Sequence, residues 1–500
     1  MTPTDYAPVD VLVIGAGNAA ANAALAAHES GARVAMLETA PQEARGGNSA
    51  FTGGAFRFVY SGVDDLLALA PDIKDLDLAS IDFGTYTEGQ YFDDMGRLTE
   101  YRCDPELTEV LIGNSYESAK WLRKHGVRFQ PALGRQAFKV DGKFKFWGGL
   151  ACHILGGGAQ LVPTLHAALE KAGVPVLYDT TAYALLTDDA RVQGVRVRHR
   201  GRSVDLRAKS VVLACGGFES NAEMRARYLG PNWDLAKVRG TRFNQGYGHR
   251  MAMDIGAAAA GHWSGAHAVQ WDVNAPPYGD LTIGDRFQKH NYPFGVLVNA
   301  RGERFLDEGL DFHSYTYAKY GHEVMKQPGL FAWQIFDSKI NSLLRDEYRI
   351  ARITKETADT LEELAPKLTG VDPKAVLETL RAYNAAPRPN VAFNPNVHDG
   401  LRTIGLPIDK TNWAQKLDTP PYHAYGVTAG VTFTFGGLKV TTAAQVEDTT
   451  GVPIAGLFAA GEIVGGLYYH NYGSGTGLVA GVTFGRIAGG GAAGFARGRA

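Results

Sequence analysis

Near the C-terminus, the segment HNYGSGTGL at 470–478 places Tyr472 directly before a run of glycines and other small residues. The side chain of Tyr472 can donate one hydrogen bond to a carbonyl or carboxylate while its ring lines a pocket. The glycines after it predict a loop that enters a helix over 478–487, and the first amides of a helix stabilise negative charge without a cationic side chain. The plainer alternatives are a glycine-rich turn that only packs and a buried tyrosine bonded to backbone.

Two further segments hold side chains that could act on a substrate. In VNARGERFLDEG (298–309), Arg304 stands near Asp307 and Glu308. Arginine is a fixed cation with a pKa above about 12, so it needs a carboxylate relay to act as an acid. The ordinary alternative for such a run is a surface salt bridge. His267, in GAHAVQWD, is alone, and a lone histidine is more often a packing residue than a ligand.

The elements that must position these residues begin with a nucleotide-binding pattern. The apolar run at 11–14 predicts a buried parallel strand, and Gly15, Gly17 and Ala20 give the spacing G-x-G-x-x-A at the start of an alanine-rich helix. Glu38 follows the next predicted strand. Glycines at this turn let the backbone approach a pyrophosphate at the helix N-terminus, and the acid accepts hydrogen bonds from a ribose. The pattern therefore predicts dinucleotide binding.

Further glycine pairs favour a flavin over a nicotinamide. RGGNSAFTGGAFR (45–57) follows Glu38, VVLACGGFESN (211–221) is a strand that ends in a glycine turn, and GLFAAGE (456–462) is a strand that ends in an acid. An isoalloxazine extends beyond the pyrophosphate and needs close backbone on one face. No second strand–helix–acid pattern for NAD(P) is visible. We therefore expect a separate electron donor or acceptor, which could be a protein, a quinone or a dye.

Together these stretches resemble the succinate dehydrogenase and fumarate reductase flavoprotein family over nearly the whole chain. The resemblance is carried by RGGNS, HGVRFQP (125–131), GGFESN, RGTRFNQG (239–246), GERFLDEG (302–309) and LDTPPY (417–422). Within the family they are most similar to the tricarballylate dehydrogenases. The resemblance implies an α/β fold in which a discontinuous, Rossmann-like FAD-binding domain carries an inserted α+β cap domain.

The same resemblance implies the division of the chain. The FAD-binding domain is expected at 1–240 and again at 345–500, with the cap domain at 241–344 between them. Within the second part, the apolar spacing of 371–386 predicts a packing helix, and the Pro/Asn-rich stretch 387–400 predicts a loop.

The cofactor implied is FAD, held without a covalent bond, because 45–57 contains no histidine like the one that carries the flavin in covalent family members. The residues expected to bind it are Gly15, Gly17, Ala20 and Glu38 on the ADP half, Gly46, Gly47, Asn48, Ser49, Gly53 and Gly54 along the pyrophosphate and flavin, Ala182 at the adenine, Gly216 in the glycine turn after the buried strand, Glu462 at the ribityl chain, and Gly477 and Leu478 at the pyrimidine end. The amides of GSGTGL are expected to face the N1–C2=O edge of the flavin.

The resemblance also implies catalytic roles, and two positions depart from it. Arg304 matches the arginine that passes a proton to or from the substrate, and His267 matches a histidine that binds a substrate carboxylate. Phe433 stands where the fumarate reductases have a histidine, and Tyr472 where they have an arginine. Losing such groups removes roughly 1.5–3 kcal/mol per ionic hydrogen bond, which disfavours fumarate and succinate as substrates. The segment HNYGSGTG is also similar to the loop of 3-ketosteroid dehydrogenases, in which a tyrosine polarises a ketone.

The sequence thus predicts an FAD-dependent dehydrogenase or reductase that acts on CH–CH groups. Hydride would move between flavin N5 and a substrate carbon, and a carbon–carbon double bond would form or be reduced beside a carboxylate or carbonyl. A polycarboxylate of the tricarballylate type is the leading substrate, and a ketone or 3-ketosteroid is the alternative. A flavin-binding electron-transfer protein without a small-molecule substrate is the alternative from another class, against which the cap domain and Arg304 argue.

Composition narrows the partners and the compartment. The 500 residues carry a net charge of −2 with a pI near 6.7, so there is no basic footprint for nucleic acid. Three cysteines show neither paired nor metal-ligand spacing, which fits a reducing compartment. No positively charged n-region opens the chain, and the uncharged stretch 11–27 falls short of the about 20 apolar residues that span a membrane. We therefore expect a cytoplasmic enzyme without a membrane span.

Overall fold

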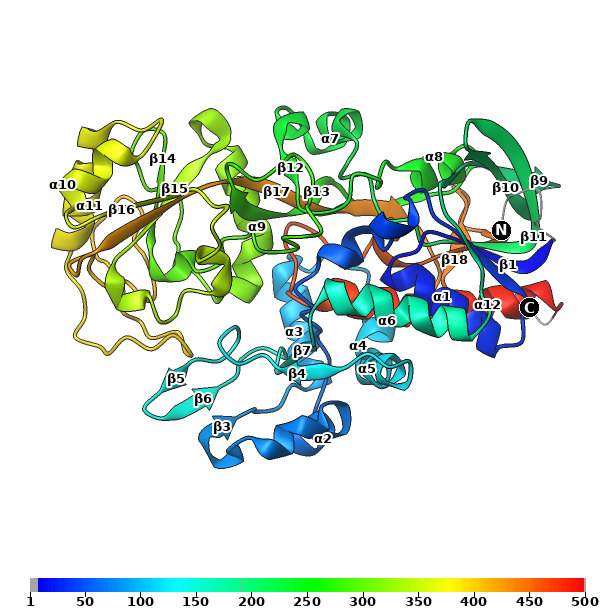
Figure 1. The fold of residues 1–500 in the computed structure, drawn as a ribbon, viewed down its shortest axis with the longest axis horizontal. Helices are drawn as coiled ribbons and strands as arrows, with labels where there is room; N and C mark the ends of the chain where they lie inside the picture. Colours follow the sequence, from blue (N-terminus) through cyan, green and yellow to red (C-terminus); the bar gives the residue numbers. More distant parts are fainter. Residues whose placement is uncertain (1–7, 190, 499–500) are drawn as a thin grey trace.

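The computed structural model describes residues 8–189 and 191–498. The centre of its first sheet is parallel, in the order β8–β2–β1–β11–β19. These strands are β1 (Val9–Ile14), β2 (Val34–Leu37), β8 (Val176–Leu177), β11 (Arg202–Leu213) and β19 (Pro453–Ala459). The apolar runs in β1 and β2 are buried, as expected for parallel strands covered on both faces (Figure 1). The expected Rossmann-like half of the α/β fold is confirmed.

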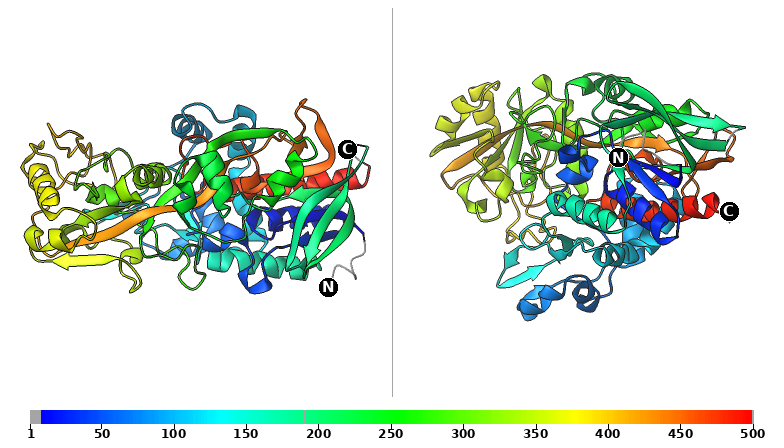
Figure 2. Two further views of the ribbon diagram at one scale, coloured as in Figure 1. Left: turned by 90° about the horizontal axis from the view of Figure 1, so that it is seen from above. Right: turned by 45° about the vertical axis from the view of Figure 1, so that its right-hand side comes forward.

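Three helices lie together beside this sheet: α1 (Asn18–Glu29), α6 (Gly158–Lys171) and α12 (Thr476–Ala496) (Figures 1 and 2). Small residues let α1 and α12 approach closely, because a Cβ atom at Gly489 would lie 2.0 Å from the carbonyl oxygen of Ala23. By length and composition α12 is the one helix in the described residues that could cross a membrane, but most of it is buried inside the protein. Core packing against α1 therefore accounts for its apolar character.

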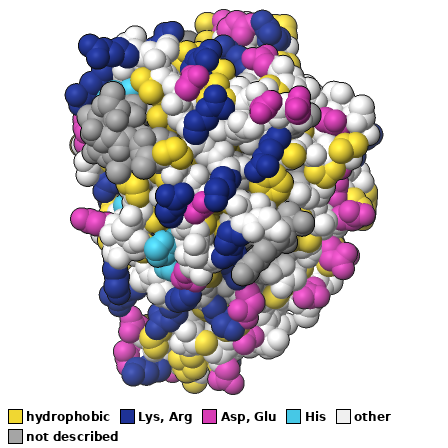
Figure 3. All heavy atoms as spheres, turned by 90° about the vertical axis from the view of Figure 1, so that its right-hand side faces the viewer, with side chains coloured by type: hydrophobic (Ala, Val, Ile, Leu, Met, Phe, Trp, Pro, Cys, Tyr) yellow, Lys and Arg dark blue, Asp and Glu magenta, His cyan; other side chains and the backbone are white. Residues whose placement is uncertain are grey.

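An antiparallel extension completes the first sheet. β9 (Thr180–Asp188) and β10 (Arg191–His199) form a meander with β11, and β18 (Gln445–Glu447) lies beside β19 at the edge of the sheet opposite to β8. Charges of both signs are interspersed on the face of the molecule shown in Figure 3. That distribution agrees with the balanced composition of the sequence.

A second sheet forms the other end of the elongated molecule (Figures 1 and 2). It contains β12 (Lys237–Val238), β13 (Ala259–Asp272), β14 (Val296–Asn299), β15 (Ala332–Phe336), β16 (Lys355–Ala358) and β17 (Tyr422–Leu438). The long strand β17 pairs with four of the others. The chain returns to the first sheet only at β18, so the boundary expected at 345 is too early. The reason is that β16 and β17, which follow it, pair within the cap sheet.

Helices complete this second unit. α9 (His313–Met325) packs on β13 and β17, while α10 (Leu361–Leu364) and α11 (Pro373–Ala385) lie at the far end. The helix predicted over 371–386 is confirmed, and it buries Val376, Leu380 and Tyr383. The stretch 387–400 forms a loop without helix or strand, as its composition predicts.

Smaller elements join the two units. The segment between β2 and α6 holds α2 (Val63–Leu69), α3 (Glu88–Leu98), α4 (Pro105–Gly113), α5 (Ser115–Lys124) and the short strands β3 (Ile81–Asp82), β4 (Phe129–Pro131), β5 (Lys139–Val140), β6 (Lys143–Lys145) and β7 (Cys152–Ile154). Two more helices, α7 (Ala222–Leu229) and α8 (Tyr247–Met253), lie on the path from β11 to β13. A capping box at Thr87 and Gln90 starts α3, which carries side chains that support the site.

Candidate active site

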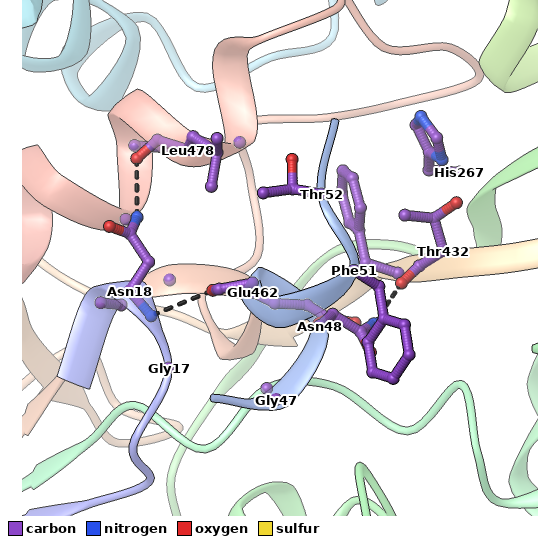
Figure 4. Close-up of a pocket in the computed structure, with 18 of the residues that line it drawn as sticks. Gly17, Asn18, Gly47, Asn48, Phe51, Thr52, His267, Thr432, Glu462 and Leu478 are labelled. Carbon is purple, nitrogen blue, oxygen red and sulfur yellow. Dashed lines mark hydrogen bonds between the residues drawn. The ribbon is translucent and has the colours of Figure 1, made fainter. Parts of the chain in front are cut away.

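A pocket runs from the N-terminus of α1 to the second sheet. At one end it is lined by the turn after β1, and at the other by His290, Arg345 and the start of α9. Figure 4 shows Asn18 and His267 on opposite sides of the pocket, with Asn48 and Glu462 between them. The pocket therefore connects the predicted dinucleotide site to side chains of the cap.

The first end of the pocket fits a pyrophosphate. Gly15 has a φ of +113°, and Gly17 is the N-cap of α1 without a side-chain cap or an acidic residue in the first turn. The helix N-terminus is thus left for an anion. Asn18 fixes its surroundings: its amide donates to Ser49 Oγ (3.0 Å) and its Nδ2 donates to the carbonyl of Leu478 (2.9 Å; Figure 4).

Glu38 stands at the end of β2, on the wall of the same pocket. Its Oε1 accepts a hydrogen bond from the amide of Ala40 (2.8 Å). Burial raises the pKa of this carboxyl from 4.5 to about 7. Hydroxyl groups of a ribose would supply the hydrogen bonds that the ionised form lacks here.

The raised pKa of Glu38 makes FAD affinity depend on pH. The carboxyl of Glu38 keeps its proton up to about pH 7 in the folded apoprotein but releases it near pH 4.5 in the unfolded chain. The contribution of Glu38 to the stability of the apoprotein therefore falls as the pH rises between these two values. FAD binding favours the carboxylate and releases the proton. The Kd for FAD can be measured by quenching of flavin fluorescence. We expect this Kd to fall by up to about tenfold for each unit that the pH rises toward 7, and to level off above pH 7. Glu38→Gln should abolish this dependence; an unchanged pH profile in the variant would contradict it.

Two buried carboxylates lie in the middle of the pocket region. Glu219 Oε1 accepts from Asn48 Nδ2 and from Asn244 Nδ2 (both 2.6 Å), and Glu462 Oε1 accepts from the amide of Thr434 (2.9 Å). Burial raises the pKa of both groups, and the charge of Glu219 raises the pKa of Glu462 further. Ionisation of both carboxyls together is therefore disfavoured. Glu219 was not among the predicted site residues, although GGFESN marks its position at the end of a strand.

The loop before α12 contains Tyr472. Its hydroxyl accepts a hydrogen bond from the amide of Gly477 (2.8 Å), and burial raises its pKa to about 12, so the protonated phenol can donate into the pocket. The amide of Gly477 therefore has Tyr472 as its partner in this structure, and the orientation of the GSGTGL amides toward the flavin stays a prediction. The helix predicted over 478–487 is present but longer, and Gly475 is its N-cap in the left-handed region.

Most residues expected to bind FAD line this one pocket. They are Gly15, Gly17, Glu38, Gly46, Gly47, Asn48, Ser49, Gly53, Gly216, Glu462, Gly477 and Leu478. Three expected residues do not line it. Ala20 is buried within α1, Gly54 packs against the carbonyl of Ile154, and Ala182 lies inside β9, while Thr180 at the start of that strand reaches the pocket instead.

Aromatic rings surround His267 on the cap side. Its imidazole stacks on Phe433 (5.1 Å between centroids) and meets Tyr317 and Tyr472 edge-on (4.8 Å each). Burial lowers the pKa of His267 well below its ordinary value, so the ring is neutral. Its Nδ1 has no hydrogen-bond partner within the described part of the chain. His267 is therefore placed to meet a ligand, but as a neutral hydrogen-bonding group.

Three arginines that the sequence did not single out line the cap end. Arg239 Nε donates to Asp285 Oδ1 (2.6 Å), and an NH2 group of Arg345 donates to His313 Nε2 (2.6 Å) and to the backbone carbonyl of Arg135 (2.9 Å). Burial lowers the pKa of Arg345 to about 10, so it remains a cation at neutral pH. These residues come from separate segments, which explains why no local motif revealed them.

Arg304, the predicted proton carrier, does not line the pocket. Its guanidinium binds both carboxylate oxygens of Glu308 and the carbonyl of Ile408, and it lies over the ring of Tyr383. Glu308 in turn accepts from the amide of Leu297 (2.8 Å). The pair is thus the salt bridge that the plainer interpretation described, although buried rather than on the surface. The catalytic assignment of Arg304 is corrected accordingly.

This position predicts a structural effect for Arg304→Met. The side chains of Arg304 and Glu308 are 6% and 0% exposed, so the substitution leaves a buried carboxylate without its partner. We expect a loss of about 3–5 kcal/mol of unfolding free energy in urea denaturation. The kcat per bound flavin should stay near the wild-type value, and a loss of kcat by orders of magnitude in folded, flavin-loaded protein would restore the catalytic role.

Comparisons with known proteins agree with the cofactor end of the pocket. A family model described as FAD binding domain matches residues 10–478. A probable fumarate reductase of Shewanella frigidimarina is 30% identical over 492 residues, covering 97% of this chain and 74% of the relative. The 3-oxosteroid 1-dehydrogenase of Mycobacterium tuberculosis is 29% identical over 412 residues, covering 76% of this chain and 70% of the relative.

The architecture agrees as well. The open conformation of a flavocytochrome c3 fumarate reductase superposes with a TM-score of 0.71 at 26% identity, covering 99% of this chain and 79% of that chain. The chain is thus similar to reductases of an unsaturated dicarboxylate and to dehydrogenases of a cyclic ketone.

Proposed function

This chain belongs to the FAD binding domain family and is an FAD-dependent oxidoreductase that acts on CH–CH groups, and we propose that the bond it forms or reduces lies beside a carboxylate. Bound FAD supplies a hydride donor or acceptor at N5. Gly15 and Gly17 would hold the pyrophosphate, Glu38 the adenosine ribose, and Glu462 the ribityl region. Each of these residues lines the pocket.

The single observation that carries the carboxylate proposal is the cluster of Arg135, Arg239 and Arg345 at the cap end of the pocket. A buried guanidinium is costly unless an anion compensates it. Asp285 pairs with Arg239, and a carboxylate of the substrate would compensate the positive charge that remains in the cluster. Such a group also activates the neighbouring carbon–carbon bond toward hydride transfer.

The second candidate substrate is a ketone, which Tyr472 favours. Its hydroxyl accepts from Gly477, so its own proton can be donated to a carbonyl oxygen, and the rings of Phe433 and Tyr468 offer an apolar wall. The similarity to 3-oxosteroid 1-dehydrogenase points the same way. A polycarboxylate of the tricarballylate type, the leading expectation from the sequence, is one version of the carboxylate proposal. It rests on sequence resemblance alone.

Tyr472→Phe separates the two candidates. If the phenol only adds one hydrogen bond to a carboxylate held elsewhere by cations, the loss should be about 0.5–1.5 kcal/mol and fall mainly on KM. If the phenol stabilises a developing enolate, kcat should fall by about 10² or more. Dye-linked assays of both proteins decide, and under the carboxylate proposal we expect the first result.

Electron supply is proposed to come from a separate carrier, and the compartment is proposed to be the cytoplasm. One similar structure is named as a flavocytochrome c3 fumarate reductase, which supports a cytochrome as the kind of electron partner. An electron-transfer flavoprotein without a small-molecule substrate is disfavoured, because buried arginines beside the flavin site indicate an anionic ligand there. The purified protein should absorb near about 450 nm and release its FAD on denaturation. A colourless protein that binds no added FAD would end the proposal.

A further inference from the structure

We propose that Arg345 and His290 form a subsite for a single carboxylate, and that the substrate is a monocarboxylate with an apolar body. This inference rests on the proposed function and names the substrate class of the same site. It also departs from the polycarboxylate expectation drawn from the sequence.

The subsite is marked by buried polar atoms that lack partners. Arg345 Nε, both ring nitrogens of His290 and Oε1 of Gln136 have no hydrogen-bond partner among residues 8–189 and 191–498. The three side chains line the pocket and are at most 8% exposed. An unpaired buried polar atom costs about 1–3 kcal/mol. Arg345 Nε and one nitrogen of the neutral His290 ring are donors, so they indicate a ligand that accepts hydrogen bonds, whereas Gln136 Oε1 is an acceptor and does not bind the carboxylate.

Neighbouring contacts hold these donors in place. Arg345 donates to His313 Nε2, which requires that nitrogen to be unprotonated, and it also donates to the carbonyl of Arg135. His290 packs edge-on against Tyr317 (4.9 Å) and alongside His313 (6.2 Å). The free Nε of Arg345 and the imidazole of His290 are therefore positioned before a ligand arrives.

The balance of charge limits the ligand to one carboxylate. Arg135, Arg239 and Arg345 contribute three positive charges, while Asp285 and Glu347 contribute two negative ones. Asp285 is 2.6 Å from Arg239, and Glu347 is 3.7 Å from Arg345. One positive charge remains. A second or third carboxylate would enter this buried region without compensation.

The rest of the substrate must be apolar, because the wall between the subsite and the flavin loop is aromatic. It is formed by Tyr317, Phe433, Tyr468, Tyr472 and the neutral ring of His267. Phe433 and Tyr472 stand where the resemblance to fumarate reductases leads one to expect a histidine and an arginine. A planar apolar body fits among rings, whereas Arg239, a cation whose charge acts on them, is already paired with Asp285 and does not serve a second anion.

The test compares trans-cinnamate with trans-cinnamamide, which differ in charge but hardly in shape, and with a dicarboxylate. Oxidised holoenzyme is titrated with trans-cinnamate, with trans-cinnamamide and with fumarate, following the change in flavin absorbance and, separately, the thermal unfolding of the protein. Wild type should bind cinnamate at least tenfold more tightly than either of the others. Equal affinity for cinnamate and cinnamamide, or tighter binding of fumarate, would overturn the inference.

Variants locate the subsite. Arg345→Met should weaken cinnamate by about 10-fold to 100-fold and leave cinnamamide unchanged, with Arg345→Lys between the two. The matched control is Arg352→Met, which removes an exposed arginine of the same region and should change neither affinity. If Arg345→Met does not fold, the wild-type pairs still decide. A ketone that perturbs the flavin while carboxylates do not would end this inference and leave the oxidoreductase class standing; absence of bound flavin would end both.

Discussion

Gly15→Ala should leave the protein unable to retain FAD. A Cβ atom at Gly15 would lie 2.3 Å from the carbonyl oxygen of Ala214, which is backbone of the neighbouring β11–loop segment and cannot rotate away. The residue also has a φ of +113°, where an L side chain is strained by about 1–3 kcal/mol. Relief requires that the turn after β1 move, and that turn forms the pyrophosphate end of the pocket.

The measurement is the ratio of FAD to protein after purification, followed by the Kd of the apoprotein for added FAD. We expect a stoichiometry near zero and a Kd raised by at least about 10², since a shift of about 1 Å in a binding element costs that much. Gly490→Ala is the matched control, because a Cβ there meets nothing within 4 Å in α12. Full retention of FAD by the Gly15 variant would show that the pyrophosphate lies elsewhere.

Arg57→Met should weaken both the fold and the catalytic loop. The guanidinium of Arg57 is buried, and it donates to the carbonyl of Ser474 (2.9 Å) and to Tyr86 (3.0 Å) while it pairs with Asp94 (3.3 Å). Its removal takes one partner from Asp94, which keeps Arg97 (3.0 Å), and deprives the carbonyl of Ser474, in the loop that carries Tyr472, of its donor. A hydrogen bond to a charged group contributes about 1.5–3 kcal/mol, so we expect a loss of that order.

Two readouts separate the effects of Arg57→Met. Urea denaturation should show the lost stability, and kcat should fall by up to about 10² at a temperature where the variant is folded, because the loop is displaced. Arg227→Met removes an arginine from an exposed pair with Glu223 and should change both quantities little. Wild-type kcat in the Arg57 variant would mean that the loop holds its own conformation.

The cofactor half of the site could be predicted because its signals are local. Gly15, Gly17 and Glu38 lie in one strand–turn–helix–strand unit, and the physics of a phosphate at a helix N-terminus requires small residues at fixed spacing. The same holds for the strands that end at Gly216 and Glu462. The structure brings these three segments to one pocket because their strands are neighbours in the parallel sheet.

The substrate half could not be predicted in the same way. Arg304 was expected to be catalytic because its segment resembles that of the family arginine that passes a proton. The spacing to Asp307 and Glu308 also suits the buried pair that the structure contains. Arg135, Arg239 and Arg345 are far apart in sequence and come together only in the folded protein, where they line one pocket. The cap boundary was misplaced for a related reason: β17 pairs with strands from both sides of residue 345, and pairing over such separations leaves no local pattern.

If this enzyme moves hydride at a carbon–carbon bond beside a carboxylate, its reduced flavin should be reoxidised by an unsaturated acid. The dithionite-reduced holoenzyme is mixed anaerobically with crotonate, trans-cinnamate, fumarate, cis-aconitate or a Δ1-unsaturated 3-ketosteroid. Return of the oxidised flavin band and the mass of the product are recorded. We expect an unsaturated monocarboxylate to reoxidise the flavin and gain two hydrogens, faster than the polycarboxylates and the steroid. Reoxidation by the steroid alone, or by none of these compounds, would contradict it.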